Sequence, residues 1–216
     1  SYHDLVGNGR VELVGTGTSD AYLRLTAPAG SAHDPWITNN SVGVRQTVSD
    51  SDLHVQAKFE SAMDSGNQLM GLVFVQDDQN FVRCDFLHDG SDLYAFSASM
   101  TAGVPGDVSS VLIANGAWPA SSPLFIDVTR SGDTWTYSYS FDNVMYTQAA
   151  SFTHALTLNS IGPFAGNAAA SPEMVVNCDW FFDQANPISP EDAGSPADVL
   201  APLIYRIDET GRTHNS

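Results

Sequence analysis

Short segments in which apolar and polar residues alternate follow one another along the first 184 residues of the chain. The clearest covers 53–60, where every second residue is apolar (Leu53, Val55, Ala57 and Phe59). Successive side chains of a strand point to opposite faces, so this period of two predicts a strand with one buried face. Segment 69–75 is apolar throughout, which is typical of a central strand. No segment keeps a helical period over three turns.

About a dozen such segments are separated by turn residues such as Gln76–Asn80 and His88–Gly90. In 134–141 the four rings of Trp135, Tyr137, Tyr139 and Phe141 fall on one face. The other predicted strands are 10–14, 21–26, 81–87, 93–100, 108–114, 124–129, 146–152, 156–162 and 174–182. Many short strands at this spacing predict an all-β fold, a two-sheet antiparallel sandwich or jelly roll.

The composition changes near residue 184. Pro, Ser and Gly become frequent in 186–196, as in a linker. Segment 201–208 then resembles one strand without partners of its own. We therefore expect a sandwich domain at 1–184, followed at 185–216 by a linker and either the first strand of a further domain or an edge strand of the sandwich.

The charge balance excludes several partners. The formal net charge is -17, with 25 acidic and 8 basic residues. Nucleic acids and anionic membranes are bound by clustered Lys and Arg, so neither is an expected partner. No apolar run approaches the length of a membrane span, and we expect any signal peptide to lie outside these residues. We expect an extracellular segment of a larger secreted or surface protein.

Catalytic signatures are missing. Two carboxylates on one strand cleave sugars in glucanase sandwiches, but the five glutamates here are isolated in sequence. No Gly-x-Ser-x-Gly elbow occurs, and the histidines lack zinc-binding spacing. Cys84 and Cys178 sit in strand-like segments, compatible with two buried thiols or one disulfide. The sequence therefore predicts a protein that is not an enzyme.

Four stretches, taken in order, resemble one family. They are 31–36 (SAHDPW), 69–83 (LMGLVFVQDDQNFVR), 130–142 (RSGDTWTYSYSFD) and 176–181 (VNCDWF). They are similar to motifs of DUF1349-type domains, which are concanavalin A-like lectin/glucanase sandwiches related to the C-terminal module of β-xylosidases. The turn at 142–146 departs from the family by lacking its usual Gly and Trp. The resemblance implies a multidomain extracellular protein that acts near polysaccharide or in adhesion.

Candidate ligand-binding residues follow from the chemistry of sugars. An aromatic ring packs against the apolar side of a pyranose, and planar polar groups bind its hydroxyls. Loops carry Trp36, beside His33 and Asp34, and also Trp118. Arg83 and Asp85 share the outward face of a predicted strand, either as a polar floor for a ligand or as an ordinary ion pair. We expect these six residues to bind a polysaccharide or cell-surface glycan.

Calcium is the candidate cofactor. Twenty of the acidic residues are Asp, which suits both turns and hard cations. By resemblance to concanavalin A-like sandwiches, Asp179 would hold a structural Ca²⁺ with Asp4 as a second ligand. Two alternatives to glycan binding remain open. One is a Ca²⁺-rigidified structural or protein-binding module of a bacterial adhesin, and the other is an accessory domain of a glycoside hydrolase.

Overall fold

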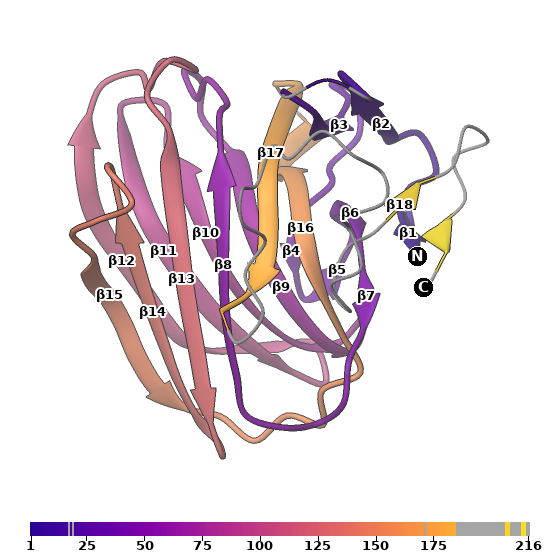
Figure 1. The fold of residues 1–216 in the computed structure, drawn as a ribbon, viewed down its shortest axis with the longest axis vertical. Helices are drawn as coiled ribbons and strands as arrows, with labels where there is room; N and C mark the ends of the chain where they lie inside the picture. Colours follow the sequence, from indigo (N-terminus) through magenta and orange to yellow (C-terminus); the bar gives the residue numbers. More distant parts are fainter. Residues whose placement is uncertain (17, 19, 171, 185–205, 208–212, 215–216) are drawn as a thin grey trace.

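The chain folds into two antiparallel sheets packed face to face (Figure 1), which confirms the predicted all-β sandwich. The computed structural model describes residues 1–16, 18, 20–170, 172–184, 206–207 and 213–214. Among these residues there is no α-helix, and no helix long and apolar enough to cross a membrane; a 3₁₀ turn, η1, covers Ala168–Ala170. The two-layer arrangement is that of a jelly roll, with neighbouring strands paired antiparallel throughout the described part.

Sheet A has eight strands. Their order is β1 (Tyr2–His3), β6 (Val42–Val44), β16 (Ser160–Asn167), β9 (Gln68–Asp77), β10 (Asn80–His88), β11 (Asp92–Thr101) and β12 (Val104–Asn115), and β7 (Gln46–Thr47) also pairs with β16.

Sheet B has seven strands, in the order β15 (Thr147–Thr153), β14 (Thr134–Ser140), β13 (Leu124–Ser131), β8 (Leu53–Phe59), β17 (Met174–Asp183), β3 (Tyr22–Ala27) and β2 (Arg10–Val14). Two small hairpins complete the described structure: β4 (Pro35–Trp36) with β5 (Thr38–Asn39), and β18 (Arg206–Ile207) with β19 (Thr213–His214).

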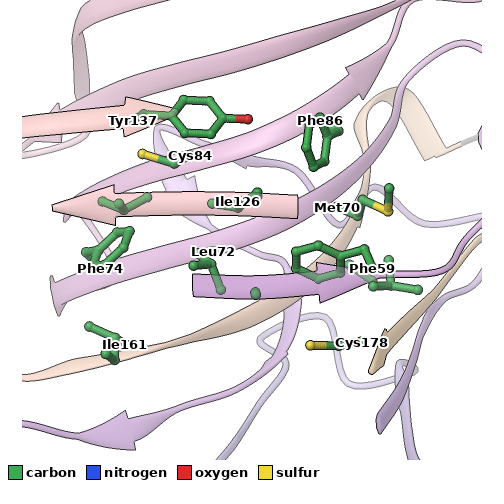
Figure 2. Packing of buried hydrophobic residues seen from close by; sticks show 14 of the residues in the cluster. Phe59, Met70, Leu72, Phe74, Cys84, Phe86, Ile126, Tyr137, Ile161 and Cys178 are labelled. Carbon is green, nitrogen blue, oxygen red and sulfur yellow. The ribbon is translucent and has the colours of Figure 1, made fainter. Parts of the chain in front are cut away.

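The main core lies between the sheets, where alternate residues of each strand meet (Figure 2). On β8, Val55, Ala57 and Phe59 are buried, as the alternation predicts. Trp135 is fully buried and meets the Phe74 ring edge-on, with ring centroids 5.1 Å apart. Facing side chains from both sheets thus exclude water from the interior, which is the main source of the fold's stability.

A second apolar cluster lies on the opposite face of sheet A. It consists of Leu69, Val73, Val75, Phe81, Ala98, Met100 and Phe164, and Trp36 packs against it. Sheet A is therefore buried on both faces over β9 and β10. This explains why segment 69–75 is apolar without alternation, because neither face of β9 meets water.

Strand β16 is the main error in the predicted elements. Residues 156–162 were expected as this strand, but it runs Ser160–Asn167, while Leu156 and Leu158 are buried loop residues. Gly162 and Gly166 allow neighbouring backbone to come close, since a Cβ on Gly162 would overlap the Val44 carbonyl oxygen. The short strands β1 and β4–β7 were not predicted, because two or three residues are too few to show a period.

The two cysteines are both buried free thiols. Cys84 lies on β10 of sheet A and Cys178 on β17 of sheet B, where the Cys178 thiol donates to the Trp180 carbonyl at 3.4 Å. Burial raises the pKa of both thiols. The sequence was compatible with one disulfide or two buried thiols, and the structure contains two buried thiols. The predicted linker and most of the predicted strand at 201–208 lie outside the described residues.

Candidate ligand-binding face

The β4–β5 hairpin covers the face of sheet A that points away from sheet B. The Asn39 backbone N–H donates to the Asp78 backbone carbonyl at 2.8 Å, which connects the hairpin to the β9–β10 turn. The Trp36 ring lies 6.3 Å from the Phe96 ring on β11. Ile37 takes the left-handed conformation at the hairpin tip, with φ of 66°. The hairpin, β10 and β11 together form the surface that we call the Trp36 face.

Arg83 and Asp85 form a buried ion pair beneath this hairpin. The Arg83 Nε and Nη2 atoms donate to the two Asp85 carboxylate oxygens at 2.7 and 2.6 Å, and Nη1 donates to the Pro35 carbonyl at 3.3 Å. The guanidinium also lies 4.8 Å from the centre of the Phe96 ring. Both side chains are almost fully shielded, with 2% and 0% of their surfaces exposed. The predicted open polar floor is therefore wrong, because the hairpin and aromatic rings cover the pair.

Asp34, Trp36 and Trp118 are the predicted site residues that stay partly accessible, and the first two lie at the start of the hairpin. Burial raises the pKa of the Asp34 carboxyl, and the charge of Arg83 opposes that shift. Within the described part of the chain no hydrogen bond reaches the Asp34 carboxylate. A partly desolvated carboxylate without a donor gains free energy from a ligand that supplies one.

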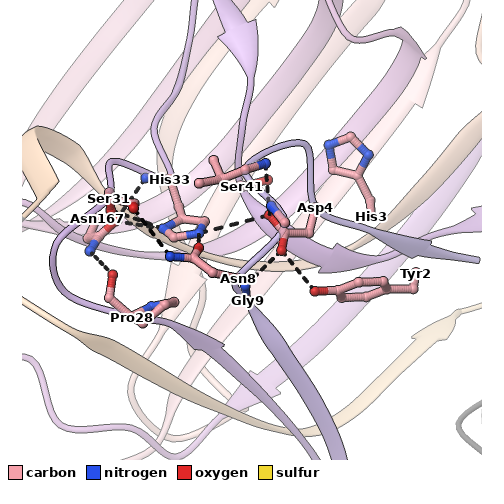
Figure 3. A network of polar contacts seen from close by, with 12 residues as sticks. Tyr2, His3, Asp4, Asn8, Gly9, Pro28, Ser31, His33, Ser41 and Asn167 are labelled. Carbon is pink, nitrogen blue, oxygen red and sulfur yellow. Dashed lines mark hydrogen bonds and ion pairs between the residues drawn. The ribbon is translucent and has the colours of Figure 1, made fainter.

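His33 has a structural position. Its ring is fully buried at the centre of a polar network (Figure 3), with Nε2 2.8 Å from the Asn8 Oδ1 atom and Nδ1 3.2 Å from the Asn167 Oδ1 atom. The His33 amide also donates to Asn167 Oδ1 at 2.9 Å. His33 therefore fixes the start of the hairpin, and its ring cannot contact a ligand in this conformation. The expectation that it binds sugar directly is wrong for this reason.

Trp118 lies at a different place. Its Nε1 atom donates to the Ser122 carbonyl at 2.7 Å, and its ring lies 5.3 Å from Phe141. It packs against the core between the sheets, whereas Trp36 packs on the opposite side of sheet A. The six predicted residues therefore do not form one site: Asp34, Trp36, Arg83 and Asp85 come together, His33 faces away, and Trp118 is separate.

The calcium ligands that the resemblance implied do not fit together. The Asp4 carboxylate accepts backbone N–H groups of Val6, Gly7 and Gly9 at 2.7 to 3.0 Å. Asp179, on β17, accepts a hydrogen bond from the Lys58 ammonium, with Nζ 2.6 Å from Oδ2. No group of three or more His, Cys, Asp or Glu in the described part of the chain could hold a metal ion. The described residues therefore do not supply the predicted pair of ligands, and calcium binding stays a prediction.

Turns explain part of the Asp excess. Asp77, Asp89 and Asp142 each accept the backbone N–H groups two and three residues further along the chain, at 2.8 to 2.9 Å. These hydrogen bonds lower the pKa of all three carboxyls. The carboxylates thus cap turns between strands, as Asp commonly does.

The aromatic part of the Trp36 face was not predicted from the sequence. Phe96 contacts both Trp36 and Arg83. It lies directly opposite Asp85 across the β10–β11 pair, and Tyr94 lies opposite Leu87. The turn at His88–Gly90 and the alternation on both sides of it could have revealed this register, because opposite residues of a hairpin share a face.

Asp34 is the carboxyl next to Trp36 that lies within reach of a ligand. Sugar-cleaving pairs need two carboxyl groups that flank the scissile bond, at about 5 to 9.5 Å from each other. Asp85 is fully buried and held by Arg83, so it cannot pair with Asp34 across a bound molecule. The geometry offers an aromatic surface and one hydrogen-bond acceptor, which are the means of binding.

Solved structures share this fold, that of a concanavalin A-like β-sandwich. The GH43 protein BlXynB from Bacillus licheniformis is 18% identical with a TM-score of 0.59, over 74% of this chain and 32% of its own. A functionally unknown protein from Saccharomyces cerevisiae is 11% identical with a TM-score of 0.60, over 87% and 96%. A legume lectin-like domain from Entamoeba histolytica is 9% identical with a TM-score of 0.57, over 82% and 88%.

These likenesses define the class of fold and nothing finer, because the identities are low. This chain spans about a third of the length of the GH43 protein that it matches. No family model matches the sequence, and no curated protein matches it.

Proposed function

We propose that this domain is a non-catalytic carbohydrate-binding module that holds a glycan on the Trp36 face. The observation that carries the proposal is that Asp34 and Trp36, two residues apart at the start of the hairpin, are both partly exposed, and that the Asp34 carboxylate has no hydrogen-bond donor among the described residues. The ring would pack against the apolar side of a sugar and the carboxylate would accept its hydroxyls. Arg83, Asp85 and Phe96 support the two contact residues from below.

The same geometry supports binding without cleavage, since Asp85, whose carboxyl interacts electrostatically with Asp34, is buried and held by Arg83. The acidic composition and the four motif stretches support an extracellular protein with a DUF1349-type domain. We include both in the proposal. The partner would then be a polysaccharide or a cell-surface glycan.

A glycan array that spans plant, algal and microbial polysaccharides, followed by calorimetric titration, tests this function. We expect Trp36→Ala and Asp34→Ala each to weaken binding at least about tenfold, because each removes a contact worth about 1.4 kcal/mol or more. Trp118→Phe is the matched control, since Trp118 lies on the other side of sheet A and should leave binding unchanged. Absence of binding to any glycan, or binding that survives Trp36→Ala, would refute the proposal.

A second candidate is an accessory domain of a polysaccharide-acting enzyme. It is favoured by the GH43 proteins, in which the part similar to this chain is only about a third of the whole. Sequencing the gene on both sides of the region that encodes this chain distinguishes the two. A hydrolase domain in the same reading frame would support the accessory role, and its absence would favour a module that binds by itself.

A further inference from the structure

On the Trp36 face the negative charge of Asp34 is partly accessible to a ligand, whereas the positive charge of Arg83 is buried. Among the described residues, Arg83 is the cationic side chain whose charge lowers the pKa of the Asp34 carboxyl. Its Nε and Nη2 atoms are bound to Asp85 and its Nη1 atom to Pro35, and only 2% of its surface is exposed. A ligand on the face therefore meets the negative charge of Asp34 and no accessible positive charge among these groups.

More acidic groups lie along β11 beside the same face. Tyr94 is two residues from Phe96 on this strand, and its side chain points to the same side of the sheet. Burial raises the pKa of the Tyr94 hydroxyl, and the nearby carboxylates of Asp89 and Asp92 raise it further. Because a raised pKa keeps the Tyr94 hydroxyl neutral, the negative charge at this end of the face comes from the Asp89 and Asp92 carboxylates, on a chain whose net charge is already -17.

Aromatic rings beside a carboxylate form a favourable environment for a cation. The faces of Trp and Phe rings attract an ammonium group within about 6 Å, and a partly desolvated carboxylate supplies its counter-ion. A neutral sugar hydroxyl can use the acceptor but gains nothing from the charge. A uronate or sulfate group is repelled, because none of the described residues of this face offers an accessible guanidinium or ammonium to pair with it.

We infer that the Trp36 face selects glycans that carry a protonated amine, such as polymers of glucosamine. Asp34 binds the ammonium group, and Trp36 packs against the sugar ring that bears it. This inference rests on the proposed function and adds the chemical class of the ligand.

The test compares four oligosaccharides of equal length by calorimetry at about pH 6: a glucosamine oligomer, its N-acetylated form, a cello-oligosaccharide and an oligogalacturonate. We expect the glucosamine oligomer to bind about tenfold more tightly than the two neutral ones, and the galacturonate not to bind. Asp34→Asn should remove this preference while the neutral oligomers still bind. Trp36→Ala should weaken binding of all of them.

Asp133→Asn is the control for overall charge. Asp133 is exposed on the β13–β14 turn of sheet B, so this variant removes one negative charge far from the Trp36 face. The inference is overturned if Asp133→Asn lowers amine binding as much as Asp34→Asn, or if neutral and amine oligomers bind equally well. In the latter case the proposed glycan-binding function survives. If no oligosaccharide binds and the glycan array is also empty, the proposed function fails with it.

Discussion

Breaking the Arg83–Asp85 pair tests whether the Trp36 face is built as described. Asp85→Ala leaves the Arg83 guanidinium buried, without its two carboxylate acceptors at 2.7 and 2.6 Å. Loss of one partner of a buried ion pair costs about 3 to 5 kcal/mol of the free energy of unfolding. The nearby Asp34 charge compensates in part, so we expect the lower end, about 3 kcal/mol.

Urea unfolding followed by tryptophan fluorescence measures this loss, and the four tryptophans of the chain provide the signal. For a domain of this size, about 3 kcal/mol corresponds to a decrease of roughly 6 to 12 °C in melting temperature. The double variant Arg83→Met with Asp85→Leu should lose much less, because it leaves no unpaired buried charge.

Two results would contradict this reasoning. A loss below about 1 kcal/mol in Asp85→Ala would match a solvent-exposed pair, such as an open polar floor would contain. An equal loss in the single and the double variant would show that packing, and not the orphaned charge, determines the cost.

Two further predictions concern pH and metal ions. The hydrogen-bonded carboxyls of Asp77, Asp89 and Asp142 have lowered pKa values in the folded state, so their contribution to stability is complete above about pH 4 and is lost as the pH falls further. The urea midpoint should therefore fall between about pH 4 and pH 2, and an unchanged midpoint there would contradict the turn-capping role. If Asp4 and Asp179 serve only their protein donors, EDTA will leave the melting temperature unchanged. A clear fall in EDTA that calcium reverses would instead establish the calcium module.

The sequence alone determined the fold class and most of the strands. Segments 10–14 and 53–60 alternate clearly and form β2 (Arg10–Val14) and β8 (Leu53–Phe59). Period-two patterning has this power because a strand with one wet face must place its apolar side chains on the other. It failed at β16, where glycines and a proline resembled a turn although close backbone packing requires the glycines.

Only the tertiary structure decided which polar residues face a ligand. The pattern placed Arg83 and Asp85 correctly on the face opposite Val82 and Cys84, but it could not show that residues 34–39 fold over that face and bury it. It also could not show that Trp36 and Trp118 lie on opposite sides of sheet A. Alternation tells which side of its own strand a residue occupies, whereas what covers that side depends on contacts between segments distant in sequence.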